Sequence, residues 1–364
     1  MFNNIYSDKK ILVTGHTGFK GSWLCLWLKS LGAEVAGFSA YVPSKPAHFD
    51  FLQEDAYDLS IEGDVRDFEL LKKEIDNFCP DIVFHLAANP IVSDCYKDPR
   101  MAFEVNLMGT VNVLEAVKDS KSVKSVVMIT SDKCYENVEW YYGYREGDKL
   151  GGIDPYSASK ACAEIAISSL QRSFLKEKGI RVCSARAGNV IGGGDWAANR
   201  IIPDIVKKWY SSEELSIRSP NSTRPWQHVL EPLSGYLQLG AILDEDIKSL
   251  EGEAFNFGPR ENLDISVLEV VKSMSKYING SWKVEADASF KKEAGLLKLN
   301  CDKANFLLDW QASLNYEETI RFTAQWYKEF YEGNRDSICE FSKNQIKEYC
   351  LIAKKKNTSW SLDD

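Results

Sequence analysis

The sequence lacks three features that would each mark a large class of proteins: a positive net charge, a long apolar run and a cluster of histidines. Its formal net charge of -9 provides no basic field for nucleic acid. No apolar run approaches membrane-spanning length. The first residues also lack the charged-then-apolar pattern of a secretion signal. We therefore expect neither a nucleic-acid partner nor a membrane association.

The histidine and cysteine content limits the chemistry further. Only four histidines occur, and none forms a ligand cluster with cysteines, so the sequence predicts no metal site. The nine cysteines lack paired spacing, which is typical of reduced thiols in a cytosolic protein. We therefore expect a cytoplasmic location.

The N-terminal segment has the order strand, glycine turn and helix. An apolar strand over Lys10–Thr14 leads into Gly15-His-Thr-Gly-Phe-Lys-Gly21, and helical character continues from Ser22 to Lys29. A dinucleotide site needs a tight turn, a close approach of the backbone to the pyrophosphate and free N–H groups at a helix N-terminus. The spacing GxxGxxG in this context predicts such a site. Its candidate residues are Gly15, Thr17, Gly18, Phe19 and Gly21.

The second strand, over residues 34–40, should end in an acid that holds the ribose hydroxyls of the adenosine. Glu34 instead stands at its beginning, and Ser39 occupies the C-terminal tip. No arginine at the tip favours a 2′-phosphate, although Lys45 lies a few residues on. The residues favour NAD only slightly, and NADP stays open as the alternative.

The following residues continue to alternate between apolar strands and helices, which indicates a parallel sheet covered on both faces. The predicted strands span 57–61, 81–86, 125–130 and 179–184, and the predicted helices span 68–78, 101–118 and 156–176. We therefore predict an α/β fold with a doubly wound parallel (Rossmann) sheet. Ligands in such sheets bind beyond the carboxyl ends of the strands. Further cofactor-binding candidates there are Asp64, Val65, Leu86, Ala87, Ala88, Asn106 and Thr130.

Two of the polar residues in this region have structural alternatives. Asp64 is equally well explained as a helix-capping or loop acid. For His85, inside an apolar strand, we favour a hydrogen-bonded packing role over ligand binding.

The alternation changes near residue 188. Gly192–Trp196 is a glycine-rich break, and the smaller elements expected over 255–258, 265–277 and 317–331 do not make a second nucleotide fold. We predict an NAD-binding domain over residues 1–187. Residues 188–364 should form mainly a smaller, mixed α/β substrate lobe, with some segments returning to the first domain. We expect the last residues, 354–364, to form a frayed end.

The pair Tyr156 and Lys160 carries the chemistry. Four residues apart on a helix, the two side chains share one face. A phenol is a poor base at neutral pH, but a neighbouring cation and a positive nicotinamide ring stabilise its phenolate. Tyr156 could then take a proton from a hydroxyl while hydride leaves the same carbon. Thr130-Ser131-Asp132-Lys133 at the end of the preceding strand adds a hydroxyl, an acid and an amine.

With these motifs the chain resembles the extended short-chain dehydrogenases/reductases and, among them, the nucleotide-sugar 4,6-dehydratases. The similarity spans nearly the whole chain and is closest to the CDP-glucose 4,6-dehydratase family. The segments that carry it are Gly15–Leu24, Ser131–Tyr135, Tyr156–Lys160, Arg186–Asn189, Arg224–His228 and Cys301–Trp310.

The resemblance implies a lyase that holds NAD tightly and forms a 4-keto-6-deoxy sugar nucleotide. Tyr156, assisted by Ser131, would remove the 4-hydroxyl proton as hydride passes to NAD. Asp132 would donate a proton to the departing 6-hydroxyl before the hydride returns to C6. Related dTDP-glucose dehydratases have a glutamate, assigned as the C5 base, where this chain has Lys133. We interpret Lys133 as that base; the alternatives are an ion pair with Asp132 or Glu136, or phosphate binding.

The candidates for holding the nucleotide diphosphate are Asn189, Arg200 and Arg224, since arginine suits phosphate oxygens. Surface solvation is the alternative for the arginines. In the resembling family the helices over 101–118 and 156–176 form a dimer interface, so we expect a homodimer or homotetramer. The resemblance alone indicates CDP; a dehydratase of dTDP- or UDP-glucose, a nucleotide-sugar 4-epimerase and a non-catalytic NAD(P) sensor are the rival hypotheses.

Overall fold

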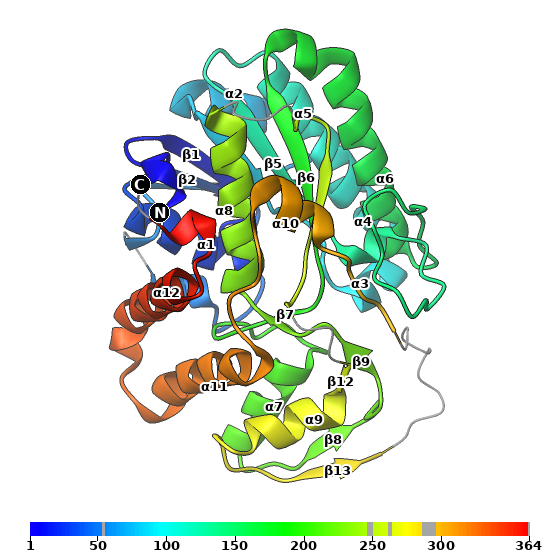
Figure 1. The fold of residues 1–364 in the computed structure, drawn as a ribbon, viewed down its shortest axis with the longest axis vertical. Coiled ribbons are helices and arrows are strands. Elements are labelled where there is room, and N and C mark those ends of the chain that lie inside the picture. The colour runs from blue at the N-terminus through cyan, green and yellow to red at the C-terminus, as the bar shows by residue number, and fades with distance from the viewer. Residues whose placement is uncertain (53–54, 246–249, 261–263, 286–295, 363–364) are drawn as a thin grey trace.

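The computed structural model describes residues 1–52, 55–245, 250–260, 264–285 and 296–362. Within these ranges seven strands form one sheet, and every neighbouring pair in it is parallel. The doubly wound parallel sheet predicted from the sequence is confirmed (Figure 1). From edge to edge the strands are β11 (Ala254–Phe257), β6 (Arg181–Ala187), β5 (Ser125–Ile129), β4 (Ile82–His85), β1 (Lys10–Thr14), β2 (Glu34–Ser39) and β3 (Leu59–Glu62).

Two helical layers cover the sheet. Alternate residues of a strand face opposite layers, because successive side chains point to opposite sides. Leu12 of β1 lies in the core cluster of one layer, whereas Ile11 and Val13 lie in that of the other. The first layer contains α2 (Phe68–Phe78), α5 (Gly109–Lys118) and α6 (Pro155–Leu170), and the second contains α1 (Phe19–Ser30) and α8 (Leu230–Glu245).

The two long helices predicted over 101–118 and 156–176 are present but contain π-helical turns. The first runs from α4 (Pro99–Phe103) through the turn Glu104–Met108 into α5. The second is α6 followed by the turn Gln171–Leu175. Residues of both helices line the site described below.

A smaller mixed α/β lobe lies below the sheet in the view of Figure 1. It contains three two-stranded sheets, of which one is antiparallel and two are parallel. The sheets pair β7 (Val190–Ile191) with β10 (Gln227–His228), β9 (Thr223–Arg224) with β12 (Ile265–Ser266), and β8 (Leu215–Ile217) with β13 (Trp282–Val284). Among the described residues, the α-helices not yet named belong to both parts of the molecule. They are α3 (Val92–Lys97), α7 (Ile201–Tyr210), α9 (Val267–Met274), α10 (Asp302–Leu308), α11 (Tyr316–Glu332) and α12 (Ile338–Lys355).

Two expectations for the C-terminal half are wrong. Residues 255–258 were expected in the smaller lobe, but Phe255–Phe257 belong to β11, which pairs with β6 at the edge of the large sheet; this segment is one of those that return to the first domain. The C-terminal segment is not frayed, because Trp360 is only 1% exposed. Its ring stacks on Phe2 with 5.0 Å between centroids and on Tyr349 with 5.6 Å. Apolar burial of this large side chain anchors the tail beside the N-terminus.

Three further properties of the described part of the chain bear on function. All nine cysteines are free thiols. The helices described include none with the length and apolar character needed to cross a membrane. Nor do the described residues contain a group of three or more His, Cys, Asp or Glu side chains placed to hold a metal ion.

Candidate active site

The predicted site residues gather where four neighbouring strands end. Gly15 follows β1, Ser39 is the last residue of β2, Leu86 follows β4 and Thr130 follows β5. These strands are adjacent in the order β5-β4-β1-β2 and run in parallel, so their carboxyl ends meet at one edge of the sheet. The fold therefore brings together residues that lie in separate sequence motifs.

The glycine turn after β1 is as tight as a dinucleotide site requires. Gly15 has a φ of 75°, and a Cβ there would lie 2.7 Å from the backbone nitrogen of Ala87. A Cβ on Gly21 would lie 2.1 Å from the carbonyl oxygen of Gly15. Gly18 is the N-cap of α1 and supplies no side chain to cap the helix. The first N–H groups of α1 are thus available to an anion, and the residues fit the pyrophosphate of a dinucleotide.

Ser39, at the tip of β2, braces this turn. Its hydroxyl lies 2.8 Å from Nδ1 of His16 and accepts a hydrogen bond of 3.3 Å from the backbone N–H of Thr17. The Thr17 hydroxyl donates to the carbonyl of Tyr41 at 2.7 Å. Burial lowers the pKa of His16 to about 4, so its imidazole is neutral. The serine that replaces the expected acid therefore orders the glycine turn through a neutral histidine.

Asp64 is a loop acid that pairs with Arg66, with 2.7 Å between its Oδ2 and the guanidinium Nη2. Hydrogen bonds from Arg66 lower the pKa of its carboxyl. The cap of α2 is Asp67, which accepts a hydrogen bond of 3.0 Å from the N–H of Leu70. The side chain of Val65 is buried in the core cluster that contains α2 and α5. Asp64 thus lies beside the sheet edge without capping a helix.

Asn106 is fully buried in the π-helical turn and joins two parts of the site. Its Oδ1 accepts from the N–H of Asn89 at 2.8 Å, and its Nδ2 donates to the hydroxyl of Ser159 at 2.9 Å. The half-buried segment 86–88 precedes Asn89, and the N–H of Ala87 donates to the Thr14 hydroxyl at 3.2 Å. Asn106 therefore ties the loop after β4 to helix α6.

His85 has the packing role that we expected. It is 2% exposed, and its ring nitrogens lie 2.8 Å from the Thr14 hydroxyl and 3.3 Å from the Thr110 hydroxyl. Burial lowers its pKa to about 3, so it is uncharged at neutral pH.

Tyr156 and Lys160 lie in the first turns of α6, which begins with Asp154 as its N-cap and Pro155 at its first position. Both side chains are buried, and the Lys160 ammonium donates to the carbonyl of Ile129 at 3.3 Å. Burial raises the pKa of Tyr156 to about 12. A hydrogen bond from Ser131 and the charge of Arg200 act in the opposite direction, favouring the phenolate. Burial lowers the pKa of Lys160 to about 8.

Asp132 is a buried carboxyl adjacent to this pair. It is 3% exposed, and its Oδ1 accepts from the Ser131 hydroxyl at 3.0 Å. Its Oδ2 is buried with no hydrogen-bond partner among the described residues. Burial raises the pKa of Asp132, although the charges of Lys133, Lys20 and Arg224 oppose the shift. A raised pKa favours the protonated form of the carboxyl, which can donate a proton.

Lys133 extends toward Tyr156, with its ammonium nitrogen 6.0 Å from the centre of the phenol ring. Glu136, one of the ion-pair partners considered from the sequence, pairs instead with Lys149 at 2.6 Å. The half-buried amine of Lys133 therefore faces the phenol of Tyr156.

Arg200 and Arg224 both contribute charge to the same site. Arg200 pairs with Asp195 at 3.0 Å and favours ionisation of Tyr156, while Arg224 donates to the carbonyl of Thr223 at 2.7 Å and acts on Asp132. Asn189 lies just after β6 and accepts, through its carbonyl, a hydrogen bond of 3.3 Å from the N–H of Gln227.

Lys20 also belongs to this environment, although the sequence analysis gave it no catalytic role. Its ammonium nitrogen lies 3.5 Å from the hydroxyl of Tyr236. Burial, together with the charges of Arg200 and Lys160, lowers its pKa to about 8. Its position inside the glycine turn Gly15–Gly21 indicates from the sequence that it can reach a cofactor phosphate, but its contact with Tyr236, more than two hundred positions away, is set by the fold.

A buried ion pair behind the catalytic residues was also missed. Glu164 pairs with Arg186 at 2.8 Å, and the two side chains are 3% and 4% exposed. Two signals in the sequence could have indicated it. Glu164 stands one helical turn after Lys160, and Arg186 is a charged residue in the buried part of strand β6, where it needs a partner.

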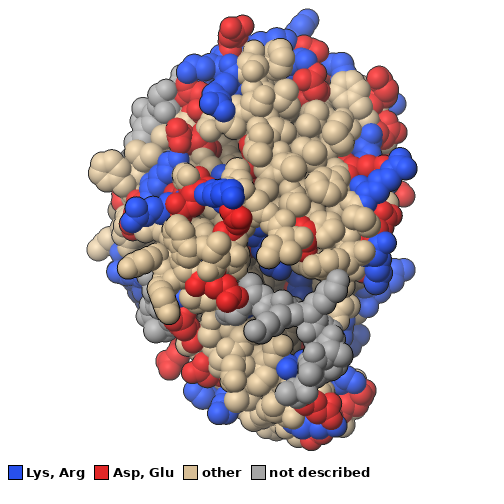
Figure 2. All heavy atoms as spheres, turned by 90° about the vertical axis from the view of Figure 1, so that its right-hand side faces the viewer, with Lys and Arg blue, Asp and Glu red and all other residues tan. Residues whose placement is uncertain are grey.

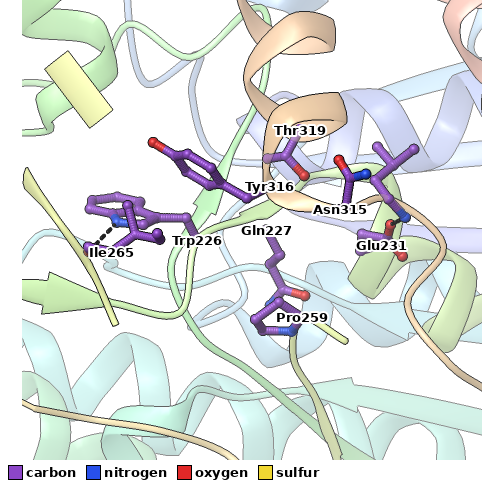
Figure 3. Close-up of a pocket in the computed structure, with 9 residues that line it drawn as sticks. Trp226, Gln227, Glu231, Pro259, Ile265, Asn315, Tyr316 and Thr319 are labelled. Carbon is purple, nitrogen blue, oxygen red and sulfur yellow. Dashed lines mark hydrogen bonds between the residues drawn. The ribbon is translucent and has the colours of Figure 1, made fainter. Parts of the chain in front are cut away.

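A small pocket opens beside β9 and β12, lined by Trp226, Ile265 and Tyr316 among others (Figure 3). Trp226, Tyr316 and Ile265 stand at one side of it, and Glu231 and Asn315 at the other. None of its lining residues is among the predicted site residues.

Comparison with known proteins agrees with this geometry. Residues 12–323 match the family described as GDP-mannose 4,6 dehydratase. The chain is 44% identical to the CDP-glucose 4,6-dehydratase of Salmonella typhimurium, over 95% of this chain and 97% of the relative. It is 23% identical to the CDP-paratose 2-epimerase of Salmonella typhi, over 87% and 98% of the two chains.

The solved structures that share the fold include dehydratases and epimerases. The dTDP-glucose 4,6-dehydratase of Bacillus anthracis, solved in complex with NAD, aligns with a TM-score of 0.74 at 23% identity, over 89% of this chain and 98% of its own. An epimerase of Methanothermobacter thermautotrophicus aligns with a TM-score of 0.77 at 24% identity, over 91% and 95%. The fold alone thus leaves both reactions open, and the site residues must distinguish them.

Proposed function

The chain belongs to the GDP-mannose 4,6 dehydratase family, and from this premise we propose that it is a CDP-glucose 4,6-dehydratase. The reaction would convert CDP-D-glucose to CDP-4-keto-6-deoxy-D-glucose. The observation that carries the proposal is the buried acid Asp132, followed by Lys133, beside the base Tyr156. A 4-epimerase needs the Tyr156 and Lys160 pair but no acid and amine after Ser131.

We propose NAD as the resident cofactor. The glycine turn leaves room only for backbone, and the uncapped start of α1 offers N–H groups to the pyrophosphate. The residues that would hold NAD are those at the carboxyl ends of the strands, with Ser39, Asp64 and Thr130 among them. When bound, NAD supplies a site that accepts a hydride from the sugar and returns it in the same turnover. The absence of an acid at the tip of β2 leaves NADP as the alternative.

The oxidation at C4 is assigned to Tyr156. Its phenolate takes the proton of the 4-hydroxyl, and the hydroxyl of Ser131, on turning from Oδ1 of Asp132, would donate a hydrogen bond that stabilises the phenolate. The charge of Arg200 favours ionisation of the phenol, and Lys160 lies one turn further along the same face of α6. These groups make a phenol of high pKa into a usable base.

The elimination is assigned to Asp132 and Lys133. A ketone at C4 acidifies the hydrogen at C5, which the Lys133 amine removes, while the neutral Asp132 carboxyl gives its proton to the departing 6-hydroxyl to form water. In the last step C6 would regain the hydride that was removed from C4, and the Lys133 ammonium would return a proton to C5. Tyr156 retains the proton of the 4-hydroxyl, and solvent exchange restores Asp132 and Tyr156 for the next turnover.

The two parts of the chain divide the ligands in this proposal. Residues 1–187 bind the dinucleotide, and the lobe within 188–364 binds the nucleotide sugar. Asn189, Arg200 and Arg224 hold the diphosphate, which suits the fork of two guanidinium groups. We also propose a cytoplasmic location, which the nine free thiols support.

A homodimer or homotetramer is a further part of the proposal. Met108, Ile165 and Phe174, on the helices expected at the interface, are 47%, 59% and 48% exposed. Figure 2 shows a broad uncharged area on the side of the molecule that carries α6. Apolar area of this kind on paired helices favours association. Light scattering after size-exclusion chromatography tests it, and a monomer would contradict it.

The direct test of the reaction is incubation with CDP-glucose in deuterated water, followed by NMR and mass analysis of the product. We expect a 4-keto-6-deoxy sugar that carries deuterium at C5. Turnover of dTDP- or UDP-glucose without turnover of CDP-glucose would keep the chemistry and change the substrate. A product epimerised at C4 with its 6-hydroxyl intact would replace the dehydratase by a 4-epimerase.

A further inference from the structure

Glu164 is a buried carboxylate that the reaction proposed above does not use. It lies on α6 one turn beyond Lys160 and is 4% exposed. The hydroxyl of Thr130 donates to its Oε1. The hydroxyl of Ser184 and Nη2 of Arg186 donate to its Oε2 at 2.7 and 2.8 Å. Three donors from two strands thus fix both oxygens of one carboxylate.

Arg186 extends this arrangement to the catalytic turn. Its Nη1 donates to the hydroxyl of Tyr135 at 2.8 Å, and its guanidinium carbon lies 4.9 Å from the centre of the Tyr135 ring. The Tyr135 hydroxyl in turn donates to Oδ1 of Asn256 at 2.7 Å. Tyr135 closes the turn 131–135 that carries the serine, the acid and the amine. Helix α6, strand β6 and the catalytic turn are therefore joined by one buried network.

Glu164 and Lys160 dock on consecutive residues of the same strand end. The Lys160 ammonium donates to the carbonyl of Ile129, and the next residue, Thr130, donates to Glu164. The hydrogen bonds set the axial position of α6 against β5. Since Tyr156 lies one turn before Lys160 on the same helix, they also set the position of the catalytic phenol.

Glu164 is also the negative charge that acts on Lys160. The groups that favour the ammonium form of Lys160 are Glu164 and the thiols of Cys134 and Cys95. Burial raises the pKa of both thiols, that of Cys95 to about 11, so both are neutral at pH 7. Burial opposes ionisation of Glu164, but the charge and hydrogen bond of Arg186 lower its pKa below the usual value. Glu164 is therefore the anion among them.

The other groups near Lys160 do not replace this charge. His85, on β4, is neutral because burial lowers its pKa to about 3. Lys20, on α1, is a cation, and its charge and that of Lys160 repel each other. Within the described residues, the ammonium of Lys160 thus depends on the carboxylate one turn away.

We propose that Glu164 is a positioning residue of the active site, which keeps Lys160 cationic and, through Arg186 and Tyr135, holds the catalytic turn 131–135 against helix α6. This inference rests on the proposed function, since Lys160 matters to turnover only if Tyr156 is the base.

The effect of Glu164 on the charge of Lys160 and its effect on the structure of the turn 131–135 can be distinguished by how the rate depends on pH. Lys160 and the proton donor Asp132 must both be protonated in the active form, so each deprotonation gives an alkaline limb of kcat, and Glu164 acts on Lys160 but is not among the groups that shift the pKa of Asp132. A carboxylate favours a nearby ammonium, and its removal lowers the pKa of Lys160 below its present value of about 8. The alkaline limb must then move to lower pH. A purely structural loss would instead reduce kcat by the same factor at every pH.

The test compares Glu164→Gln with two matched controls, Glu164→Asp and Tyr135→Phe, in the holoenzyme at saturating CDP-glucose. For Glu164→Gln we expect the alkaline limb of kcat to lie about one pH unit or more lower than in the wild type. This shift corresponds to roughly a tenfold loss of kcat at pH values above the limb and a smaller loss below it. Glu164→Asp keeps the charge and should keep the limb within about half a unit. Tyr135→Phe breaks the link to Asn256 without removing charge, so kcat should fall with no shift of the limb.

An alkaline limb of Glu164→Gln that coincides with that of the wild type would overturn the proposal. If this variant does not fold, Glu164→Asp decides: a limb moved by a full unit while the carboxylate is retained would equally refute it, and an unshifted limb would support it. An inactive wild type in the same assay would show that the proposed function has failed. An active wild type, together with a Glu164→Gln variant whose alkaline limb is not shifted, would show that only this inference has failed and that the proposed function stands.

Discussion

Replacement of Ser131 by alanine should move the pH at which the enzyme becomes active. The Ser131 hydroxyl forms the hydrogen bond that lowers the pKa of Tyr156 against the effect of burial. A hydrogen bond to a charged group is worth about 1.5–3 kcal/mol, and one pKa unit corresponds to about 1.4 kcal/mol. Removing the hydroxyl should therefore raise the pKa of Tyr156 by roughly one to two units. The phenolate then forms at higher pH, so the acid limb of kcat/KM moves up by the same amount.

The assay is the pH dependence of kcat/KM for CDP-glucose in Ser131→Ala and the wild type. Below both limbs the variant should be slower by roughly 10- to 100-fold, and the difference should shrink as the pH rises. Ser131→Thr is the matched control, since it retains a hydroxyl at the same position and should keep the wild-type limb. A loss of rate that is equal at every pH would refute the reasoning, because Ser131 would then act only by holding Asp132, whose Oδ1 it contacts at 3.0 Å.

Three further predictions test other parts of the site. Lys133→Ala should still form the reduced cofactor, seen by its absorbance, but lose deuterium exchange at C5; normal exchange would remove the base assignment. Arg200→Gln should raise KM for CDP-glucose, since the diphosphate loses a cation; an unchanged KM contradicts diphosphate binding. Arg186→Met leaves the Glu164 carboxylate buried without its cation, which should lower the free energy of unfolding in urea by about 3–5 kcal/mol. The double variant Glu164→Gln with Arg186→Met should recover part of that loss, and a strictly additive loss would exclude coupling of the pair.

The sequence predicts the sheet well because its signals are local. Each strand of the N-terminal half is a short apolar run between helical segments, and the buried strands β4 and β5 need no side-chain alternation. The edge strand β11 was assigned to the wrong lobe for the opposite reason. Its four residues, Ala254–Phe257, are too short to show a period, and its pairing with β6 joins segments about seventy positions apart. Trp360 was misjudged similarly, since its partner Phe2 is at the other end of the chain.

For the candidate site too, the roles that depend on local sequence could be predicted, and those that depend on contacts between distant segments could not. Tyr156 and Lys160 could be paired from their spacing, and the carboxyl ends of parallel strands explain why Ser131 lies near them. The role of Ser39 could not be predicted, because its partner His16 is set by the fold of the glycine turn. The contact of Lys20 with Tyr236 could not be predicted for the same reason, since it depends on tertiary packing between distant segments.

The remaining question for the mechanism is how one pocket holds Asp132 neutral and Tyr156 ready to ionise. Burial pushes both groups toward their neutral forms, which suits the acid and opposes the base. The two groups also act on each other, because the charge of an ionised Asp132 would raise the pKa of Tyr156 further. A protonated Asp132 would therefore have two effects. It would supply the proton for elimination, and, because it carries no negative charge, it would not repel the phenolate of Tyr156. Cations such as Lys133 and Arg224 pull Asp132 the other way, yet its pKa remains raised. Substitution of Asp132 by asparagine should consequently stop water loss but leave oxidation at C4 intact. A 4-epimerase gains nothing from such a balance, which is why the buried acid favours the dehydratase.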